Sequence, residues 1–282
     1  MSGPTLDALI ASVGEMGTLP DSWHRIDEVV SRPSATTAQI SDAISTDPAL
    51  SARLLRLANS PLLGMTQRID RLSQAVHLIG TRQIRELALA TSVVDTLSKI
   101  PGSRERMQVY LLRSVSAGLV ARGLAGRRRE ANVERFFVIG LLHHIGVLVL
   151  DMYAPESAQV VRTTVQATNE PSEQVELDVL GYDHAAVGAA LLTRWKLPTS
   201  LIEPIAFHHK PYQAPTQRVE SAAAHVASIV TELLAPGSLV TTPFDPRAWE
   251  LLAVDAQALT PITNAAEEQA KTMLGALIGT AE

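Results

Sequence analysis

Residues 136–150 read Phe136-Phe137-Val138-Ile139-Gly140-Leu141-Leu142-His143-His144-Ile145-Gly146-Val147-Leu148-Val149-Leu150, and they form the most apolar stretch of this 282-residue chain. Only the two adjacent histidines interrupt it. At ~15 residues it is shorter than the ~20 that an α-helix needs to cross a bilayer. We therefore predict a buried, nearly all-apolar helix over 133–145, ended by Gly146, and no membrane association.

The flanking sequence has helical signals as well. Asp47 suits a helix cap, Pro48 suits the first turn, and apolar residues recur at helical spacing from Leu50 onward. Gly80 ends one predicted helix and Thr81 caps the next. The pattern predicts an all-α fold, with helices over 48–59, 73–79, 81–97, 106–126, 184–196, 218–234, 246–253 and 263–278.

Two turn signals divide these helices. They are Ile100-Pro101-Gly102 and Pro236-Gly237. We predict an N-terminal helical lobe over 18–100, a second helical lobe over 106–235, and a C-terminal tail with short helices over 236–282.

The composition excludes several kinds of site. The chain has no Cys, which removes disulfides, thiolate zinc sites, Fe–S clusters and Cys nucleophiles. Aromatic residues are only 4%, which argues against base stacking. The absence of Cys fits a cytoplasmic protein, which is our prediction.

Charge is unevenly distributed. Residues 53–129 hold 14 basic and 4 acidic residues, whereas residues 142–282 hold 7 basic and 16 acidic ones. Arg82, Arg85 and Arg113 are candidate anion-binding residues, which leaves an arginine-rich nucleotide or nucleic-acid binder as one alternative. We favour a solvated basic face that pairs with the acidic second lobe, and we expect no nucleic-acid partner because the net charge is −5.

Six of the eight histidines lie between residues 143 and 225. In a helical protein without Cys, such a group is the natural place to look for a metal ion, although a hydrogen-bonded core histidine is commoner than a ligand. Adjacent residues on a helix point about 100° apart. We therefore do not expect His143 with His144, or His208 with His209, to share one ion.

Five motifs follow one another along the chain. They are Ile44-Ser45-Thr46-Asp47-Pro48-Ala49-Leu50 with Leu54-Leu55-Arg56-Leu57-Ala58-Asn59-Ser60; Ala75-Val76-His77-Leu78-Ile79-Gly80; Gly140-Leu141-Leu142-His143-His144-Ile145-Gly146; Tyr182-Asp183-His184-Ala185-Ala186-Val187-Gly188-Ala189-Ala190-Leu191-Leu192; and Trp195-Lys196-Leu197-Pro198 with Ile205-Ala206-Phe207-His208-His209. Together they resemble the HDOD domain (HD-related output domain), a branch of the HD superfamily, over roughly residues 18–235.

The resemblance implies an HD-like helical bundle in the second lobe. Catalytic HD phosphohydrolases hold a divalent metal with a His, a His-Asp pair and a distal Asp. By motif, His143 keeps the His of the pair and His144 replaces its Asp, while the first His falls at Arg113 and the distal Asp at Ser228. No GYP element follows His208-His209, which argues against cyclic-di-GMP hydrolysis.

The replaced ligands predict a non-catalytic bacterial signal-transduction output or adaptor protein. It would bind a protein partner, or a nucleotide, through a degenerate pocket, without a cofactor; a homodimer stays open. The alternative is a metal-dependent phosphohydrolase or phosphodiesterase in which Arg113 steers an anionic substrate. Its divalent metal site would be rebuilt from His143, His144, Asp183, His184, His208 and His209.

Overall fold

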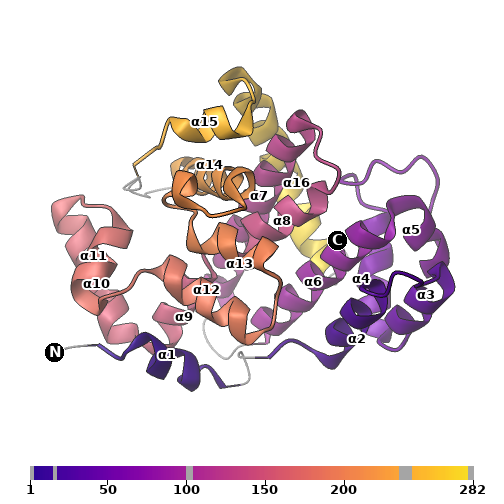
Figure 1. Ribbon diagram of the computed structural model, residues 1–282, viewed down its shortest axis with the longest axis horizontal. Coiled ribbons are helices and arrows are strands. Elements are labelled where there is room, and N and C mark those ends of the chain that lie inside the picture. Colours follow the sequence, from indigo (N-terminus) through magenta and orange to yellow (C-terminus); the bar gives the residue numbers. More distant parts are fainter. Residues whose placement is uncertain (1–2, 15–17, 100–103, 235–242, 279–282) are drawn as a thin grey trace.

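The computed structural model describes residues 3–14, 18–99, 104–234 and 243–278, and every regular element in these ranges is a helix (Figure 1). The predicted all-α class is confirmed. The turn signals at 100–102 and 236–237 lie outside the described residues.

In the described part of the range predicted as the first lobe, four short helices precede α6 (Thr81–Ser98). They are α2 (Asp21–Val30), α3 (Thr37–Ser45), α4 (Pro48–Ala58) and α5 (Leu72–Ile79). Three of them, α2, α4 and α5, pack against α6. Asp47 caps α4 as predicted, since its carboxylate accepts from the Leu50 N–H at 3.0 Å. Thr81 is not a cap, because α6 already includes it and Gly80, at φ 100°, takes the cap position.

In the range predicted as the second lobe, the long helix α7 (Arg104–Arg128) and its neighbour α8 (Val133–Leu142) make the most extensive helix pair. The elements that follow are α9 (Ile145–Tyr153), α10 (Pro155–Thr168), α11 (Ser172–Leu180), α12 (His184–Arg194), α13 (Thr199–Ala206), η2 (Pro211–Gln213) and α14 (Arg218–Leu234). Helix α14 packs against both α7 and α8, and α12 packs against α9 and α13. Helix α14 has the predicted bounds, whereas α7 extends two residues beyond Gly126.

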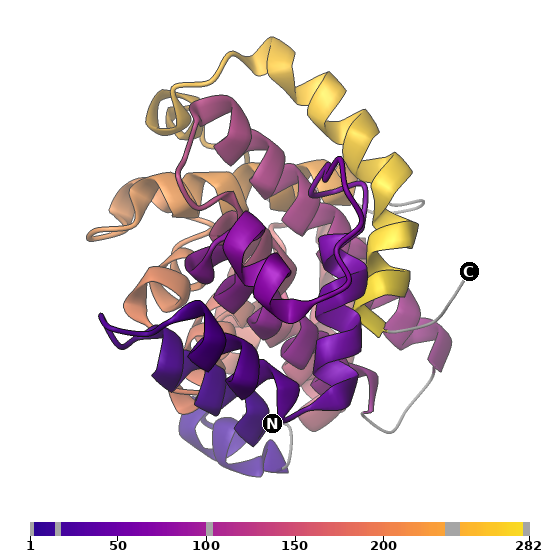
Figure 2. The ribbon, with the colours of Figure 1, turned by 90° about the vertical axis from the view of Figure 1, so that its right-hand side faces the viewer.

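Both ends of the chain pack on these lobes. Helix α1 (Leu6–Ser12) contacts α12, and the hydroxyls of Tyr153 and Tyr182 donate to carbonyls of the N-terminal segment. At the other end, α15 (Arg247–Leu252) contacts α14, and η3 (Ala256–Ala258) leads into α16 (Leu259–Ile278). Helix α16 packs against α4, α6 and α7, so it contacts both lobes (Figure 2).

The apolar stretch 136–150 lies at the centre of the helices that follow α7. Among the described residues, Val133–Tyr153 is the one segment long and apolar enough to span a membrane, and 72% of its apolar window is buried inside the fold. This segment does not form one continuous helix: α8 ends at Leu142, and α9 begins at Ile145. Its hydrophobicity therefore belongs to the core.

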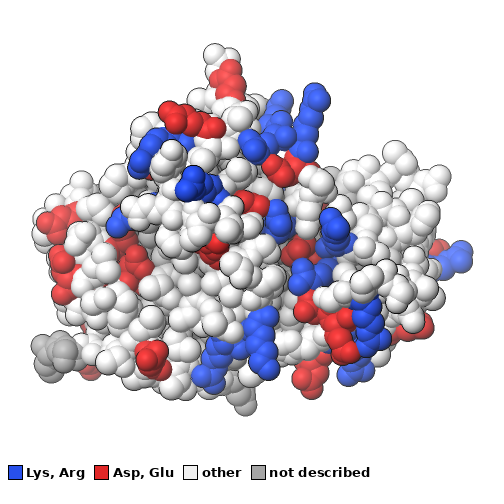
Figure 3. Space-filling view, in the orientation of Figure 1, with Lys and Arg blue, Asp and Glu red and all other residues white. Residues whose placement is uncertain are grey.

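The basic residues of the first half are partly neutralised by nearby acids. Arg85 lies 2.6 Å from Asp27, and Arg53 lies 2.5 Å from Asp95. These pairs form within the first lobe and not, as expected, with the acidic second lobe. Figure 3 shows acidic side chains gathered on the side of α10 and α11, and basic ones interspersed with acids over the rest of this face.

Candidate functional site

The two adjacent histidines occupy the break between α8 and α9. His143 caps the C-terminus of α8, and His144 has non-helical angles of φ −101° and ψ 16°. Close packing accompanies the break, since a Cβ on Gly146 would overlap the backbone oxygen of His184. The prediction of one helix over 133–145 is therefore wrong. Because the chain turns here, the two imidazoles lie with ring centroids 3.8 Å apart instead of pointing 100° apart.

Three further histidines meet this pair from α12 and from the turn after α13. His184 is the first residue of α12, while His208 and His209 follow the end of α13 at Ala206. The His184 and His209 Nε2 atoms are 3.0 Å apart, and the ring centroids of His143 and His208 are 5.6 Å apart. We call His143, His144, His184, His208 and His209 the histidine cluster.

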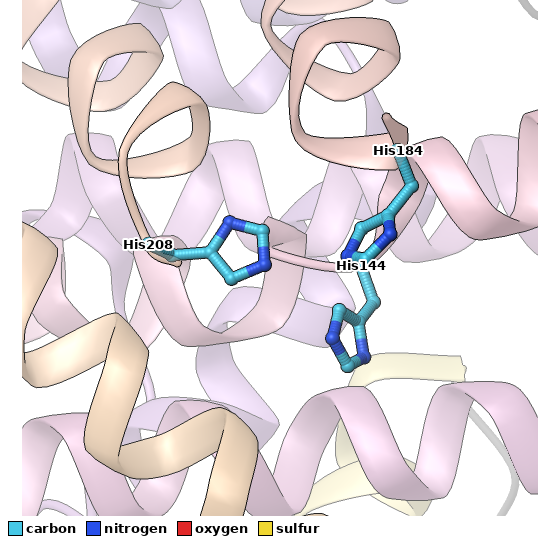
Figure 4. A group of neighbouring side chains, drawn as sticks. All are labelled: His144, His184 and His208. Carbon is cyan, nitrogen blue, oxygen red and sulfur yellow. The ribbon is translucent and has the colours of Figure 1, made fainter. Parts of the chain in front are cut away.

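Three members of the histidine cluster could hold a metal ion together. Candidate ligand nitrogens of His144, His184 and His208 all lie within 4.8 Å of one another (Figure 4). Imidazole suits zinc, iron, nickel and copper, and zinc binds a histidine nitrogen at about 2.0–2.1 Å, so the nitrogens would have to close slightly around the ion. The group takes one histidine from each adjacent pair, together with His184.

Three imidazoles of the cluster have a buried nitrogen without a hydrogen-bond partner among the described residues: His209 at Nδ1, and His143 and His208 at Nε2. The Nδ1 of His143 lies 2.7 Å from the Gly140 carbonyl, and that of His208 lies 2.7 Å from the Ile205 carbonyl. A carbonyl only accepts, so Nδ1 carries the proton in both rings and Nε2 carries a lone pair. Both Nε2 atoms are buried without a hydrogen-bond partner in the described part of the chain. Each could therefore bind a metal ion or accept a hydrogen bond.

Two glutamates on α11 that sequence reasoning missed lie beside the histidines: Glu176, which is buried, and Glu173, which is partly buried. Glu176 accepts from both the backbone N–H and the Nδ1 of His184, each at 2.7 Å. Glu173 lies 4.0 Å from the Nδ1 of His209. The one sequence signal was their spacing of three residues on a helix that ends just before Asp183-His184. That spacing alone does not show that the helix folds back over the histidines.

Burial and neighbouring charges set the protonation of these rings. Burial lowers the pKa of His143 to about 4 and, together with the other histidines, holds the pKa of His144, His208 and His209 well below the usual range. Burial also acts to lower the pKa of His184, but the charge and hydrogen bond of Glu176 raise it overall. A protonated His184 can donate to Glu176 and His209 at once.

Two polar side chains of α14, Ser228 and His225, contact residues of the histidine cluster. Ser228 Oγ lies 3.1 Å from the His144 Nε2, so the residue at the predicted distal-Asp position does reach the cluster. The His225 Nδ1 lies 2.8 Å from the His208 carbonyl, and its Nε2 accepts from the Asp245 N–H at 2.9 Å. His225 therefore joins the turn that carries His208 to the segment before α15.

The remaining predicted site residues lie elsewhere. The Asp183 side chain caps α12 by accepting from the Ala186 N–H at 2.8 Å. Arg113 is exposed on α7, Arg82 is exposed at the start of α6, and Arg85 is paired with Asp27. The three arginines do not enter the histidine cluster.

An all-α fold with these motifs around a histidine cluster defines an HD-like helical protein. The HDOD domain family profile matches residues 16–211, and the chain belongs to that family.

Known relatives extend this likeness. An uncharacterised protein of Treponema pallidum (strain Nichols) is 30% identical over 207 residues, which are 73% of this chain but only 40% of that protein. An HDOD domain protein of unknown function from Geobacter sulfurreducens has a TM-score of 0.73 and 24% identity, covering 92% of this chain and 91% of its own.

Two further solved structures share the fold. A candidate phosphohydrolase from Shewanella amazonensis SB2B has a TM-score of 0.70 and 24% identity, covering 96% of this chain and 97% of its own. A candidate signal transduction protein from Marinobacter aquaeolei VT8 has a TM-score of 0.70 and 19% identity, covering 92% of this chain and 59% of its own.

Proposed function

We propose that this protein is a non-catalytic bacterial signal-transduction module that acts in the cytoplasm by binding a protein partner. Membership of the HDOD family and the structural likeness to a candidate signal transduction protein support the proposal. In this proposal the histidine cluster is the structural centre of the second lobe, and it performs no chemistry.

The observation that carries the proposal is how the histidine cluster uses its hydrogen bonds. Its rings are bonded to backbone carbonyls, to Glu176, to Ser228 and to one another. His208 is 0% exposed and His184 is 2% exposed. A phosphate ester would have to reach nitrogens that the fold buries. His144, at the break between α8 and α9, and Ser228, on α14, stand where the HD pattern has carboxylates for the ion.

A metal-dependent phosphohydrolase is the second candidate, favoured by the arrangement of His144, His184 and His208 and by the unpartnered Nε2 of His208. The donor set fits an ion that prefers imidazole. Such an ion would supply a bound water of lowered pKa. Glu176 would orient His184 through its Nδ1, and Ser228 would orient His144.

Metal content and turnover separate these two functions. Protein purified without a His-tag would be analysed by elemental mass spectrometry, then assayed with bis(p-nitrophenyl) phosphate before and after incubation with manganese, iron or zinc. We expect a folded protein that contains no stoichiometric metal and shows no turnover. Stoichiometric metal together with turnover that His144→Ala and His208→Ala abolish would overturn the non-catalytic proposal.

Partner binding needs its own measurement. In-cell crosslinking followed by mass spectrometry should identify one recurrent protein, and purified components should then form a complex by calorimetry. The complex should persist in a His143→Gln variant that remains folded. If crosslinking yields only copies of this chain, the partner proposal fails and a homodimer replaces it.

A further inference from the structure

A cavity of about 380 Å³ lies between α7, α16 and the turn after α4, and it shares no residue with the histidine cluster. This volume is within the range of roughly 300–1,000 Å³ that small-molecule sites occupy. Helix α16, the long yellow helix in Figure 2, contacts α7 and α4. The lining residues are Leu62, Leu119, Arg122, Gly123, Gly126, Arg127, Pro261, Ile262, Ala265, Ala266 and Gln269. We call this cavity the α7–α16 pocket.

Most residues that line the α7–α16 pocket are apolar or small, and polar and apolar atoms form nearly equal parts of its exposed surface. Leu119 and Ile262 are largely buried beneath it, at 6% and 8% exposure. A Cβ on Gly126 would meet no atom within 4 Å, although the residue lines the pocket. Part of the space therefore exists because residue 126 has no side chain.

The two arginines of the pocket differ in their partners. Arg122 is held by Glu134, with Nε 3.0 and 3.2 Å from the two carboxylate oxygens, and it donates to the Leu62 carbonyl at 3.1 Å. Arg127 is exposed, and its guanidinium makes no ion pair or hydrogen bond within the described residues. Glu134 is committed to Arg122, so the pocket has one cation in excess.

The neighbouring charges leave Arg127 available. Arg128 is tied to Glu130 at 2.7 Å and to the carbonyls of Leu251 and Leu252. Glu267 and Glu268 on α16 are exposed and do not line the pocket. Gln269 adds an amide that can donate or accept on the opposite wall.

We propose that the α7–α16 pocket binds a small organic acid, with its apolar body between the two helices and its acidic group on Arg127. An apolar body gains free energy by leaving water, and a guanidinium pairs well with a carboxylate or phosphate. The pocket is lined by Leu62 of the turn after α4, by α7 and by α16, so the ligand touches these three segments at once. This site goes beyond the proposed function, and it does not depend on what the histidine cluster binds.

The test measures binding of simple probes to the full chain by calorimetry or ligand-observed NMR. Octanoate and 2-naphthoate carry an apolar body and a charge; 1-octanol and 2-naphthalenemethanol carry the body alone; acetate carries the charge alone. We expect at least one of the two apolar acids to bind one per chain, about tenfold or more tightly than its neutral analogue and than acetate.

Paired variants localise the site. Arg127→Gln should weaken binding about tenfold, whereas Arg129→Gln, which removes an equally exposed charge outside the pocket, should change it less than about twofold. Gly126→Leu should abolish binding by filling the space, while Gly126→Ala should retain most of it. Thermal melting confirms that each variant is folded.

Three results would overturn the assignment. They are the absence of saturable binding by either acid, equal affinity for the acids and their neutral analogues, and equal effects of Arg127→Gln and Arg129→Gln. None of these results bears on metal content or on partner binding. Failure of this site and failure of the proposed function are therefore distinguishable.

Discussion

The histidine cluster and the α7–α16 pocket both lie beside the central helices, but they differ in the burial and pairing of their polar side chains. In the cluster, hydrogen bonds among the histidines, Glu176 and backbone carbonyls compensate most of the burial, while the Nε2 atoms of His143 and His208 have no partner among the described residues. In the pocket, Arg127 stays exposed and unpaired within the described residues. A buried polar group without a partner costs free energy, so a cluster of this kind must satisfy itself or bind an ion. A surface cation has no such need and remains free for a ligand.

The two sites also differ in the space around their glycines. Gly146 lets α9 approach the backbone of α12, where no side chain fits. Gly126 faces open space in the pocket. Changes in the cluster should therefore affect stability strongly, and changes in the pocket should affect it little.

The largest effect is expected from Glu176→Ala. The substitution leaves His184 buried without the carboxylate that accepts from its Nδ1. Loss of one member of a buried charged pair costs about 3–5 kcal/mol. Urea unfolding should show a loss of this size, and an unchanged midpoint would mean that the cluster is not held by this contact. Glu173→Ala, which removes a carboxylate 4.0 Å from His209, is the matched control and should cost less.

Gly146→Ala should destabilise the fold by about 3 kcal/mol. The added Cβ overlaps the His184 backbone oxygen, and backbone atoms yield less readily than side-chain atoms. Urea unfolding measures the loss, and circular dichroism at low denaturant shows whether the helices persist. A variant with wild-type stability would contradict the close approach of α9 and α12.

Acid should destabilise the protein when no metal is bound. Burial holds the pKa of His143 at about 4 in the folded protein, below the ordinary value of 6.5, so the unfolded chain binds the proton more readily. Stability is then complete above pH 6.5 and falls as the pH is lowered toward 4, by on the order of 3 kcal/mol from His143 alone.

His144, His208 and His209 act in the same direction, whereas His184 opposes them because its pKa is raised. Urea unfolding at several pH values measures the trend, and His143→Gln should flatten part of it. A free energy of unfolding that stays constant between pH 6.5 and 4 would contradict the burial of neutral rings.

The smallest effect is expected from Gly126→Ala. Its Cβ meets no neighbour, and alanine favours the helix over glycine, so the protein should gain about 0.4–1 kcal/mol. Differential scanning calorimetry should show a raised melting temperature. A destabilised variant would show that the pocket is closed in solution, and it would weaken the comparison with Gly146.

Much of the helical framework could be predicted from local signals. Asp47-Pro48 begins α4 as expected, and α14 has the predicted bounds Arg218–Leu234. Local signals failed at His143-His144, because nothing nearby in the sequence shows that Gly146 lies against His184. They also missed Glu173 and Glu176, whose positions depend on how α11 packs beside α12.

The sequence by itself determined the all-α class, several of the helices and the residue types of the histidine cluster, since capping, periodicity and motifs act over a few residues. Only the tertiary structure decided that five histidines meet, that Glu176 joins them and that α16 spans both lobes and leaves a pocket beside Arg127. These features depend on contacts between residues far apart in the chain. Close packing sets such contacts, and a one-dimensional pattern does not record them.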